Sequence, residues 1–377
     1  MLASVTGAAE AEIAFAGGAD VIDLKDPGRG ALGAVAPAVA HETVAAIAGR
    51  RPVSAVLGDL PMRPETVLAA AEAMAATGVD YLKLGIFAGG DVLACLKALA
   101  PLAAHLRLVA VLFADGPPDL SLLPEIAAAG FAGAMLDTQE KAGKRLLDWM
   151  DLPALRRFVT ECRDRGLMAG LAGALEAPDV PRLLVLAPDL LGFRGALTGP
   201  GGRGAALDPE RLREIRELIP PEGGPAGAGG MDYRLLAAGL YAPDPNGDPS
   251  LTDRVFVRDL VLPVVIGAYA RERHAPQPVR FEVEAHVARI RRPTQDMRDV
   301  FSYDVITDGI RMLIAAGHVA LVETLAERVA AMVLEHPRVT RVMVRLEKLQ
   351  TGSGIVGVLI ERTRDAGGTA PLPAGRA

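Results

Sequence analysis

The sequence predicts an α/β protein in which a (β/α)8 TIM barrel precedes a smaller α+β domain. Three observations lead to this prediction. At 377 residues, half of them hydrophobic, the chain is long enough for two domains with their own cores. Over about the first 220 residues, short apolar runs alternate with amphipathic stretches, as expected when a helix follows each strand. After a Pro- and Gly-rich segment, the apolar residues alternate with polar ones, which is typical of half-buried strands.

The first part of the chain contains eight candidate strands. Helix-period segments lie between them, among them Pro64–Thr77 and Pro209–Leu218. Eight strand–helix units favour a closed barrel at the short end of the range for that fold, with an open doubly wound sheet as the alternative. The expected strands are Leu2–Thr6, Val21–Lys25, Val53–Leu57, Tyr81–Ile86, Leu108–Phe113, Gly133–Asp137, Leu167–Ala172 and Leu191–Gly195.

The composition divides the chain into four segments. We expect the barrel over residues 1–219, a linker over 220–251, the second domain over 252–365 and a disordered tail over 366–377. The second domain follows the order β-β-α-α-β-β with an antiparallel sheet. Its expected elements are strands Val255–Ile266 and Val279–Val287, helices Ser302–Ala316 and Leu321–Leu334, and strands Val339–Lys348 and Ile355–Glu361.

Charge and residue usage argue against several classes of function. Forty basic and 46 acidic residues give a net charge of −6, and no stretch is strongly basic, so nucleic-acid binding is not expected. Cys95 and Cys162 lack a disulfide spacing, no two of the six histidines are spaced as metal ligands, and no apolar run reaches membrane-spanning length. The N-terminal segment also lacks a basic leader. We therefore expect a cytoplasmic enzyme of small-molecule substrates with no metal and no cofactor.

Unusual polar residues fall at the carboxyl ends of the even-numbered barrel strands, where the chemistry of this fold takes place. Asp23 and Lys25 end strand two and are two residues apart, so both point to the same face. Lys83 lies in strand four, and Asp137 ends strand six. Alternate strands contribute to the same interior layer, so we expect Lys25, Lys83 and Asp137 to approach one another near the barrel mouth.

Such a cluster suits covalent catalysis by lysine. An amine must be unprotonated to attack a carbonyl, and both burial and a neighbouring cation lower the pKa of an amine. Lys83 is the candidate neighbouring cation, and Asp23 and Asp137 are candidate proton shuttles. The alternative is that each lysine is a surface residue at a strand end whose ammonium reaches water.

Glycine-rich loops after the last two strands are candidates for phosphate recognition. Gly173 follows strand seven, and Arg194 and Gly195 lie at the end of strand eight. Barrel enzymes often bind phosphate with these two loops, although the glycines could equally be ordinary turn residues.

Four motifs in the barrel together resemble those of the (5-formylfuran-3-yl)methyl phosphate synthase family of methanofuran biosynthesis. They are Gly17–Gly33, Asp80–Gly85, Ala134–Thr138 and Gly192–Gly195. The resemblance spans residues 1 to about 218. It implies condensation of two glyceraldehyde 3-phosphate molecules to a phosphorylated furan aldehyde, with loss of phosphate and water and without a cofactor.

The same resemblance implies roles for individual residues. The Schiff-base lysine of the family falls on Lys25, and its supporting acids fall on Asp23 and Asp137. Its other important lysines fall on Lys83 and Lys141. A different triose-phosphate aldolase or isomerase on the same fold is the alternative activity.

Four residues of the second domain have ordinary interpretations when each is taken alone. Lys348 continues an apolar strand face, and Glu323 lies in the first turn of a helix, where the dipole favours an acid. Tyr303 would be a packed aromatic residue and Glu272 a solvated loop acid.

Together with their surroundings these residues resemble the dihydroneopterin aldolase family, over about 252–363. The resemblance implies the tunnelling fold and retro-aldol cleavage of a dihydropterin. Glu323 would bind the pterin, Lys348 and Tyr303 would manage protons, and Glu272 would order the site. It also implies a homo-oligomer assembled through this domain. The alternative is that the domain is an inactive oligomerisation module.

Overall fold

A computed structural model describes residues 1–140, 143–199, 202–219, 251–269, 272–289, 300–350 and 354–364. The chain divides into two compact units, Met1–Ala228 and Gly229–Ala377. The expected linker over 220–251 lies outside the described residues except for Leu251, and the expected tail lies wholly outside them, so both stay predictions.

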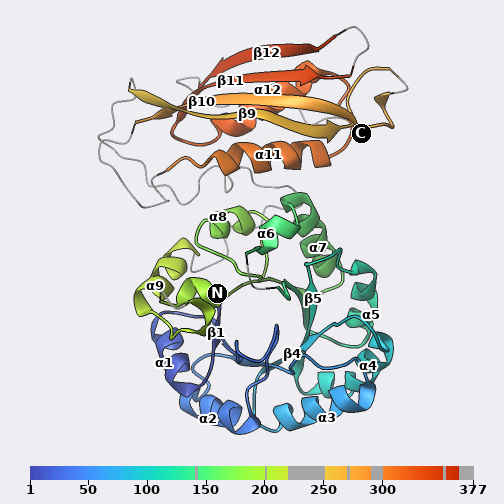
Figure 1. The fold of residues 1–377 in the computed structure, drawn as a ribbon, viewed down its shortest axis with the longest axis vertical. Coiled ribbons are helices and arrows are strands. Elements are labelled where there is room, and N and C mark those ends of the chain that lie inside the picture. The colour runs from blue at the N-terminus through green and yellow to red at the C-terminus, as the bar shows by residue number, and fades with distance from the viewer. Residues whose placement is uncertain are drawn as a thin grey trace. The chain divides into compact units, whose positions relative to one another are not determined.

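The first unit is a closed barrel of eight parallel strands in sequential order (Figure 1). Helices surround the ring of strands. The strands are β1 (Leu2–Val5), β2 (Val21–Leu24), β3 (Val53–Val56), β4 (Tyr81–Gly85), β5 (Arg107–Phe113), β6 (Gly133–Asp137), β7 (Met168–Leu171) and β8 (Leu190–Phe193). The helices are α1 (Ala8–Ala16), α2 (Pro37–Ile47), α3 (Pro64–Ala75), α4 (Val92–Leu99), α5 (Leu123–Ala128), α6 (Leu146–Trp149), α7 (Leu152–Asp164), α8 (Asp179–Leu184) and α9 (Pro209–Leu218).

Closure of the barrel explains why its strands are so apolar. β8 pairs with β1 through Gly192 and Phe193, so the sheet has no edge. Every residue of β1, β2, β3 and β6 is buried, since helices cover the outside and side chains fill the inside. The predicted (β/α)8 barrel is confirmed, and the alternative of an open sheet is wrong.

The second unit is a four-stranded antiparallel sheet with two helices. The chain order is β9 (Thr252–Val264), β10 (Gln277–Ala288), α11 (Tyr303–Ala315), α12 (Val322–Leu334), β11 (Val339–Lys348) and β12 (Val356–Thr363). In the sheet the strands lie in the order β12-β11-β10-β9. The predicted α+β architecture and its β-β-α-α-β-β order are confirmed.

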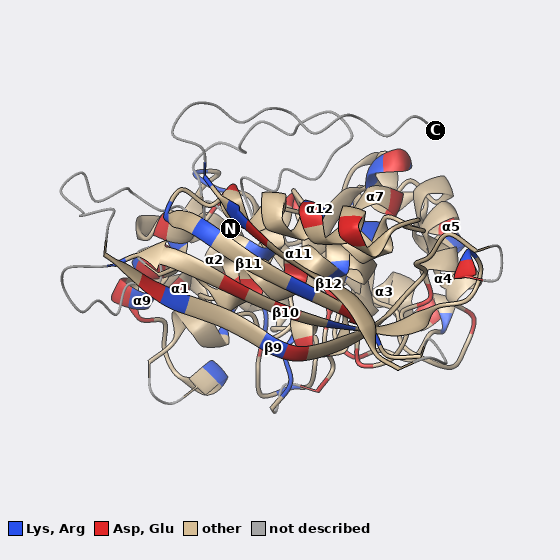
Figure 2. Ribbon diagram, turned by 90° about the horizontal axis from the view of Figure 1, so that it is seen from above, with Lys and Arg blue, Asp and Glu red and all other residues tan. Residues whose placement is uncertain are grey.

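The sheet of the second unit has one apolar and one charged face. Alternate residues of β10, such as Phe281 and Val283, are buried in a core shared with Val329 of α12 and Val344 of β11. The opposite face carries both basic and acidic residues (Figure 2). They form cross-strand ion pairs, among them Arg280 with Glu347, Arg254 with Glu284, and Arg341 with Glu361.

The described part of the chain contains no helix with both the length and the apolar character needed to cross a membrane. Within the same ranges, no group of three or more His, Cys, Asp or Glu side chains is arranged to hold a metal ion.

Candidate active sites

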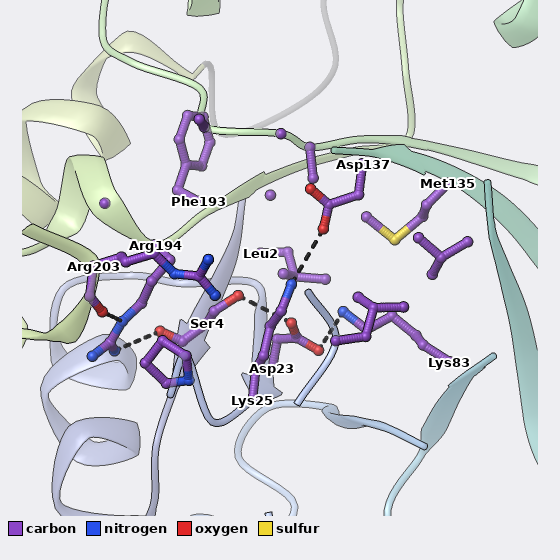
Figure 3. A pocket seen from close by; sticks show the side chains of 18 residues that line it. Leu2, Ser4, Asp23, Lys25, Lys83, Met135, Asp137, Phe193, Arg194 and Arg203 are labelled. Atoms are coloured by element: carbon purple, nitrogen blue, oxygen red, sulfur yellow. Dashed lines mark hydrogen bonds and ion pairs between the residues drawn. The ribbon is translucent and has the colours of Figure 1, made fainter. Parts of the chain in front are cut away.

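A cavity of about 200 Å³ opens at the carboxyl ends of the barrel strands (Figure 3). Six charged residues line it: Asp23, Lys25, Lys83, Asp137, Arg194 and Arg203. Gly173 and Gly195, from the loops after β7 and β8, line it as well. The polar residues expected from the even-numbered strands therefore gather around one cavity.

Lys25 follows β2 directly and meets the carboxylate at the end of β6. Its Nζ donates a hydrogen bond to Asp137 Oδ2 at 3.2 Å, although the two residues are 112 positions apart. Asp137 Oδ1 also accepts a hydrogen bond from the backbone amide of Thr138 at 2.7 Å, which fixes the orientation of the carboxylate. Lys25 and Asp137 are both buried, so the interaction is only weakly screened by water.

Asp23, which lines the same cavity as Lys25, forms an ion pair with Lys83 of β4. Lys83 Nζ is 2.5 Å from Asp23 Oδ1. The same carboxylate accepts hydrogen bonds from Ser4 Oγ at 3.1 Å and Ser54 Oγ at 2.5 Å. Ser4, Asp23 and Ser54 are register partners on β1, β2 and β3 and therefore share one face of the sheet. The cavity thus holds two separate lysine–carboxylate pairs.

The position of Lys83 disfavours its charged form. Burial lowers the pKa of the Lys83 amine, the charge of Asp23 opposes that shift, and the charge of Lys25 adds to it. Both lysines line the same cavity, and the charge of Lys25 disfavours the charged form of Lys83.

Arg194 lines the cavity, but its guanidinium is engaged elsewhere. Nη1 and Nη2 donate to the carboxylate of Glu10 at 2.6 and 3.2 Å, and Nη1 also donates to the backbone oxygen of Ser4 at 3.0 Å. These contacts join the loop after β8 to α1 and β1. Arg194 therefore acts as a clamp that connects the last strand of the barrel to the first.

Gly173 occupies a position that a larger residue would strain. Its φ is +119°, and a Cβ there would lie 2.9 Å from Thr138 Cγ2. The loop after β7 can therefore pass close to the end of β6 only with glycine at this point. Lys141, expected in the same region, lies outside the described residues, and Lys144 stacks over the ring of Trp149 at 4.1 Å.

Some residues of the barrel site escaped sequence reasoning. Asp59 accepts hydrogen bonds from the amides of Ala31 and Leu32 at 2.8 and 2.7 Å and so holds the loop that follows Lys25. Ser4 and Ser54 could have been predicted as site residues, because each is a polar residue within an apolar strand. Their contact with Asp23 depends on the strand register, which no local pattern specifies.

In the second unit, Glu272 and Lys348 form an ion pair. Lys348 Nζ is 2.5 Å from Glu272 Oε1, and Gln277 Nε2 lies 3.4 Å from the same oxygen. The hydrogen bond from Lys348, followed by that from the amide of Tyr269, lowers the pKa of Glu272 to about 2. Gly267 has a φ of +136°, which favours glycine, and a Cβ there would lie 2.1 Å from Glu272 Oε2 unless that carboxylate moved. The ends of β9, β10 and β11 thus converge on one carboxylate.

The other two predicted residues of this unit do not join that pair within one chain. Tyr303 begins α11 and is 61% exposed, and Glu323 lies exposed in the first turn of α12. In the described ranges, neither side chain hydrogen-bonds to Glu272 or Lys348. Both are open to a ligand or to another chain.

A (β/α)8 barrel with two buried lysine–carboxylate pairs around a cavity at its strand ends defines the class of the first unit as a barrel enzyme. The chain belongs to the 4-HFC-P synthase family, whose model matches residues 1–216. A second model, that of dihydroneopterin aldolase, matches residues 255–361. The two family resemblances inferred from the motifs are confirmed, and the chain is a fusion of the two domains.

Proteins similar to this chain include two relatives and one solved structure. A (5-formylfuran-3-yl)methyl phosphate synthase of Methanococcus maripaludis is 38% identical over 228 residues, covering 57% of this chain and 97% of that protein. A Methylorubrum extorquens protein provisionally given the same name is 45% identical over 221 residues, covering 58% of this chain and 91% of that protein. A crystal structure of dihydroneopterin aldolase from Burkholderia thailendensis is 29% identical, covers 30% of this chain and 93% of its own, and has a TM-score of 0.28.

Proposed function

We propose that the barrel condenses two molecules of glyceraldehyde 3-phosphate into (5-formylfuran-3-yl)methyl phosphate through a Schiff base on Lys25, with release of inorganic phosphate and water. This product would serve methanofuran biosynthesis. The observation that supports the proposal most directly is the buried contact between Lys25 Nζ and Asp137 Oδ2 at 3.2 Å, inside a cavity of about 200 Å³. The name of the relative gives the product, and the family resemblance of the motifs implies the substrate.

In the first step, Lys25 Nζ forms a bond to the aldehyde carbon, and the aldehyde oxygen leaves as water. Asp137 already accepts a hydrogen bond from this amine. It is therefore the proposed acceptor of the proton that the amine loses when it becomes a nucleophile. The resulting iminium acidifies the neighbouring C–H bond. Loss of that proton gives an enamine, which attacks the aldehyde carbon of the second triose phosphate.

Lys83 and Asp23 would assist this chemistry through their charges. Two ammonium groups in one buried layer disfavour double protonation, so Lys83 favours release of a proton from the site. Asp23, held by Ser4 and Ser54, would hold charge as intermediates form. The family resemblance alone supports a catalytic role for Lys141.

Trapping of the Schiff base tests the barrel activity. Borohydride added during incubation with glyceraldehyde 3-phosphate should fix a covalent adduct, and mass spectrometry should locate it on the peptide that contains Lys25. Lys25→Ala should abolish both the adduct and the furan product, whereas Lys97→Ala, at an exposed position of α4, should retain both. Undiminished adduct formation in Lys25→Ala would refute the assignment.

For the second unit we propose retro-aldol cleavage, or epimerisation, of a dihydroneopterin-type substrate. The Glu272–Lys348 contact supports this function, because it fixes a lysine amine at the ends of three strands. Lys348 and Tyr303 would move protons as the carbon–carbon bond breaks. Glu323 would bind the amino-pyrimidine edge of the pterin through charge-assisted hydrogen bonds.

A single substitution separates this activity from that of the barrel. A charge-assisted hydrogen bond contributes about 1.5–3 kcal/mol to binding. Glu323→Gln should therefore weaken dihydroneopterin binding at least about tenfold. The furan synthase rate should stay at the wild-type value. Equal pterin affinity in the mutant and the wild type would favour the alternative function, an inactive assembly module.

We further propose that the second unit assembles into a homo-oligomer. β9 and β12 are the outer strands of its sheet, and open edges of this length invite pairing with another chain. Both carry exposed apolar side chains, among them Phe256 and Leu359, at 51% and 60% exposure. The exposed Tyr303 would complete the pterin site of a neighbouring copy.

A further inference from the structure

A second arginine of the barrel cavity has no assigned role. Arg203 lies in the loop after β8, between Gly202 and Gly204, and its side chain lines the cavity. Among the described residues no carboxylate forms an ion pair with it. Its one hydrogen bond there is a long one, 3.4 Å from Nη2 to the backbone oxygen of Gly30. The guanidinium thus keeps most of its five N–H donors available.

The clamp formed by Arg194 holds Arg203 in this position. Arg194 Nε donates to the backbone oxygen of Arg203 at 2.9 Å, and Nη2 donates to that of Ala205 at 2.8 Å. In Figure 3, Arg194 is bonded to Ser4 and to the Arg203 backbone, while the Arg203 side chain extends toward the centre of the cavity. One arginine therefore fixes the backbone from which the other reaches inward.

The electrostatic surroundings of Arg203 suit an anionic ligand. The charge of Asp137 acts on Arg203 most strongly, but this carboxylate accepts hydrogen bonds from Lys25 Nζ and from the amide of Thr138. Burial lowers the pKa of Arg203, but a guanidinium stays protonated at neutral pH. A partly desolvated cation without a fixed counter-ion gains more from binding an anion than a solvated one.

We propose that Arg203 recognises the phosphate group of the substrate and selects phosphorylated over unphosphorylated aldehydes. The inference rests on the proposed function of the barrel. A guanidinium can bind a phosphate monoester with two parallel hydrogen bonds, and the loop after the last strand is a frequent phosphate site in this fold. A substrate with an aldehyde at one end and a phosphate at the other would span the cavity from Lys25 to Arg203. Arg194, which the sequence suggested for this role, acts instead as a positioning residue.

The test compares Arg203→Gln and Arg203→Lys with Arg213→Gln, a control at an exposed position of α9. Arg203→Gln should raise KM for glyceraldehyde 3-phosphate at least tenfold, while borohydride trapping of unphosphorylated glyceraldehyde on Lys25 proceeds at the wild-type rate. Arg203→Lys keeps the charge but not the paired donors, so its KM should lie between those of the glutamine variant and the wild type. Arg213→Gln should match the wild type in both assays.

Calorimetric titration with inorganic phosphate provides a readout that does not depend on turnover. Binding to the wild type and its loss in Arg203→Gln support the inference even if no furan product forms, in which case the proposed function alone fails. Wild-type phosphate affinity and KM in Arg203→Gln would overturn the inference while leaving the synthase activity established. The sparse contacts of Arg203 predict that both variants fold, and Arg203→Lys provides a second test of the charge.

Discussion

Replacing Asp23 by asparagine should destabilise the barrel in a pH-dependent way. Asparagine keeps the shape of the side chain and an acceptor oxygen for Ser4 or Ser54. It removes the negative charge that lies 2.5 Å from Lys83 Nζ. Asp23 and Lys83 are 1% and 5% exposed, so water cannot replace the lost partner.

Lys83 itself limits how much stability the Asp23→Asn variant can lose. Removing one partner of a buried ion pair costs about 3–5 kcal/mol in the free energy of unfolding. Lys83 can escape this cost by losing its proton. From its ordinary pKa of 10.5, neutralisation costs about 1.4 kcal/mol per pH unit, or about 5 kcal/mol at pH 7 and about 2 kcal/mol at pH 9. The destabilisation should therefore be about 3–5 kcal/mol at pH 7 and fall to about 2 kcal/mol at pH 9.

The sign of this pH dependence follows from proton binding. Burial already lowers the pKa of Lys83, and loss of Asp23 removes the charge and the hydrogen bond that oppose the shift. Below pH 10.5 the unfolded variant then binds one more proton than the folded variant. It does so over a wider pH range than the wild type. Its stability must rise with pH across that range, more than the stability of the wild type does.

Fluorescence of the single tryptophan, Trp149, gives an assay that reports on the barrel alone. Urea titrations at pH 7 and pH 9 compare the wild type, Asp23→Asn and the double variant Asp23→Asn/Lys83→Met. The double variant should recover most of the lost stability, because neither charge remains buried without a partner. Asp164→Asn, at an exposed position of α7, should change stability by less than about 0.5 kcal/mol. A loss below about 1 kcal/mol in Asp23→Asn, or one that does not shrink at pH 9, would refute the buried-pair argument.

Three further predictions concern other parts of the chain. The lowered pKa of Glu272, about 2, means that its carboxylate stabilises the second unit above pH 4.5 and loses this effect as the pH falls toward 2. Glu272→Gln should therefore lower the midpoint of the second unit's thermal unfolding at pH 7 but not near pH 2, and an equal difference at both pH values would contradict the pairing. Burial raises the pKa of the Cys162 thiol to about 12, so alkylation by iodoacetamide should be roughly a hundredfold slower in the native protein than in urea; equal rates on the Cys162 peptide would count against that burial. Mixing Tyr303→Phe with Lys348→Ala under conditions of subunit exchange should restore part of the aldolase activity if the two residues of one site come from different chains. A monomeric mass by light scattering, or exchange without recovery, would exclude this arrangement.

The strands of both units could be predicted because burial repeats with a period that the sequence displays. Gly133–Asp137 and Val339–Lys348 have the predicted bounds, and the other strands overlap theirs. The gathering of Lys25, Lys83 and Asp137 also followed from the fold, because alternate strands of a barrel contribute to one layer. The pairing of the charges within that layer did not follow. Asp23 turns to Lys83 because Ser4 and Ser54 lie beside it in the register of β1 and β3, and register is a property of assembled strands.

The two arginines after β8 show where prediction from local sequence ends. Arg194 and Arg203 are nine residues apart in a glycine-rich loop, and nothing in their neighbouring residues distinguishes a structural from a ligand-binding guanidinium. The carboxylate that engages Arg194 belongs to Glu10, 184 residues away, and reaches it only because β8 closes onto β1. Closure therefore pairs Arg194 with Glu10, and Arg194 in turn holds the backbone of Arg203. Among the described residues no carboxylate forms an ion pair with Arg203, which leaves this cation for an anionic ligand.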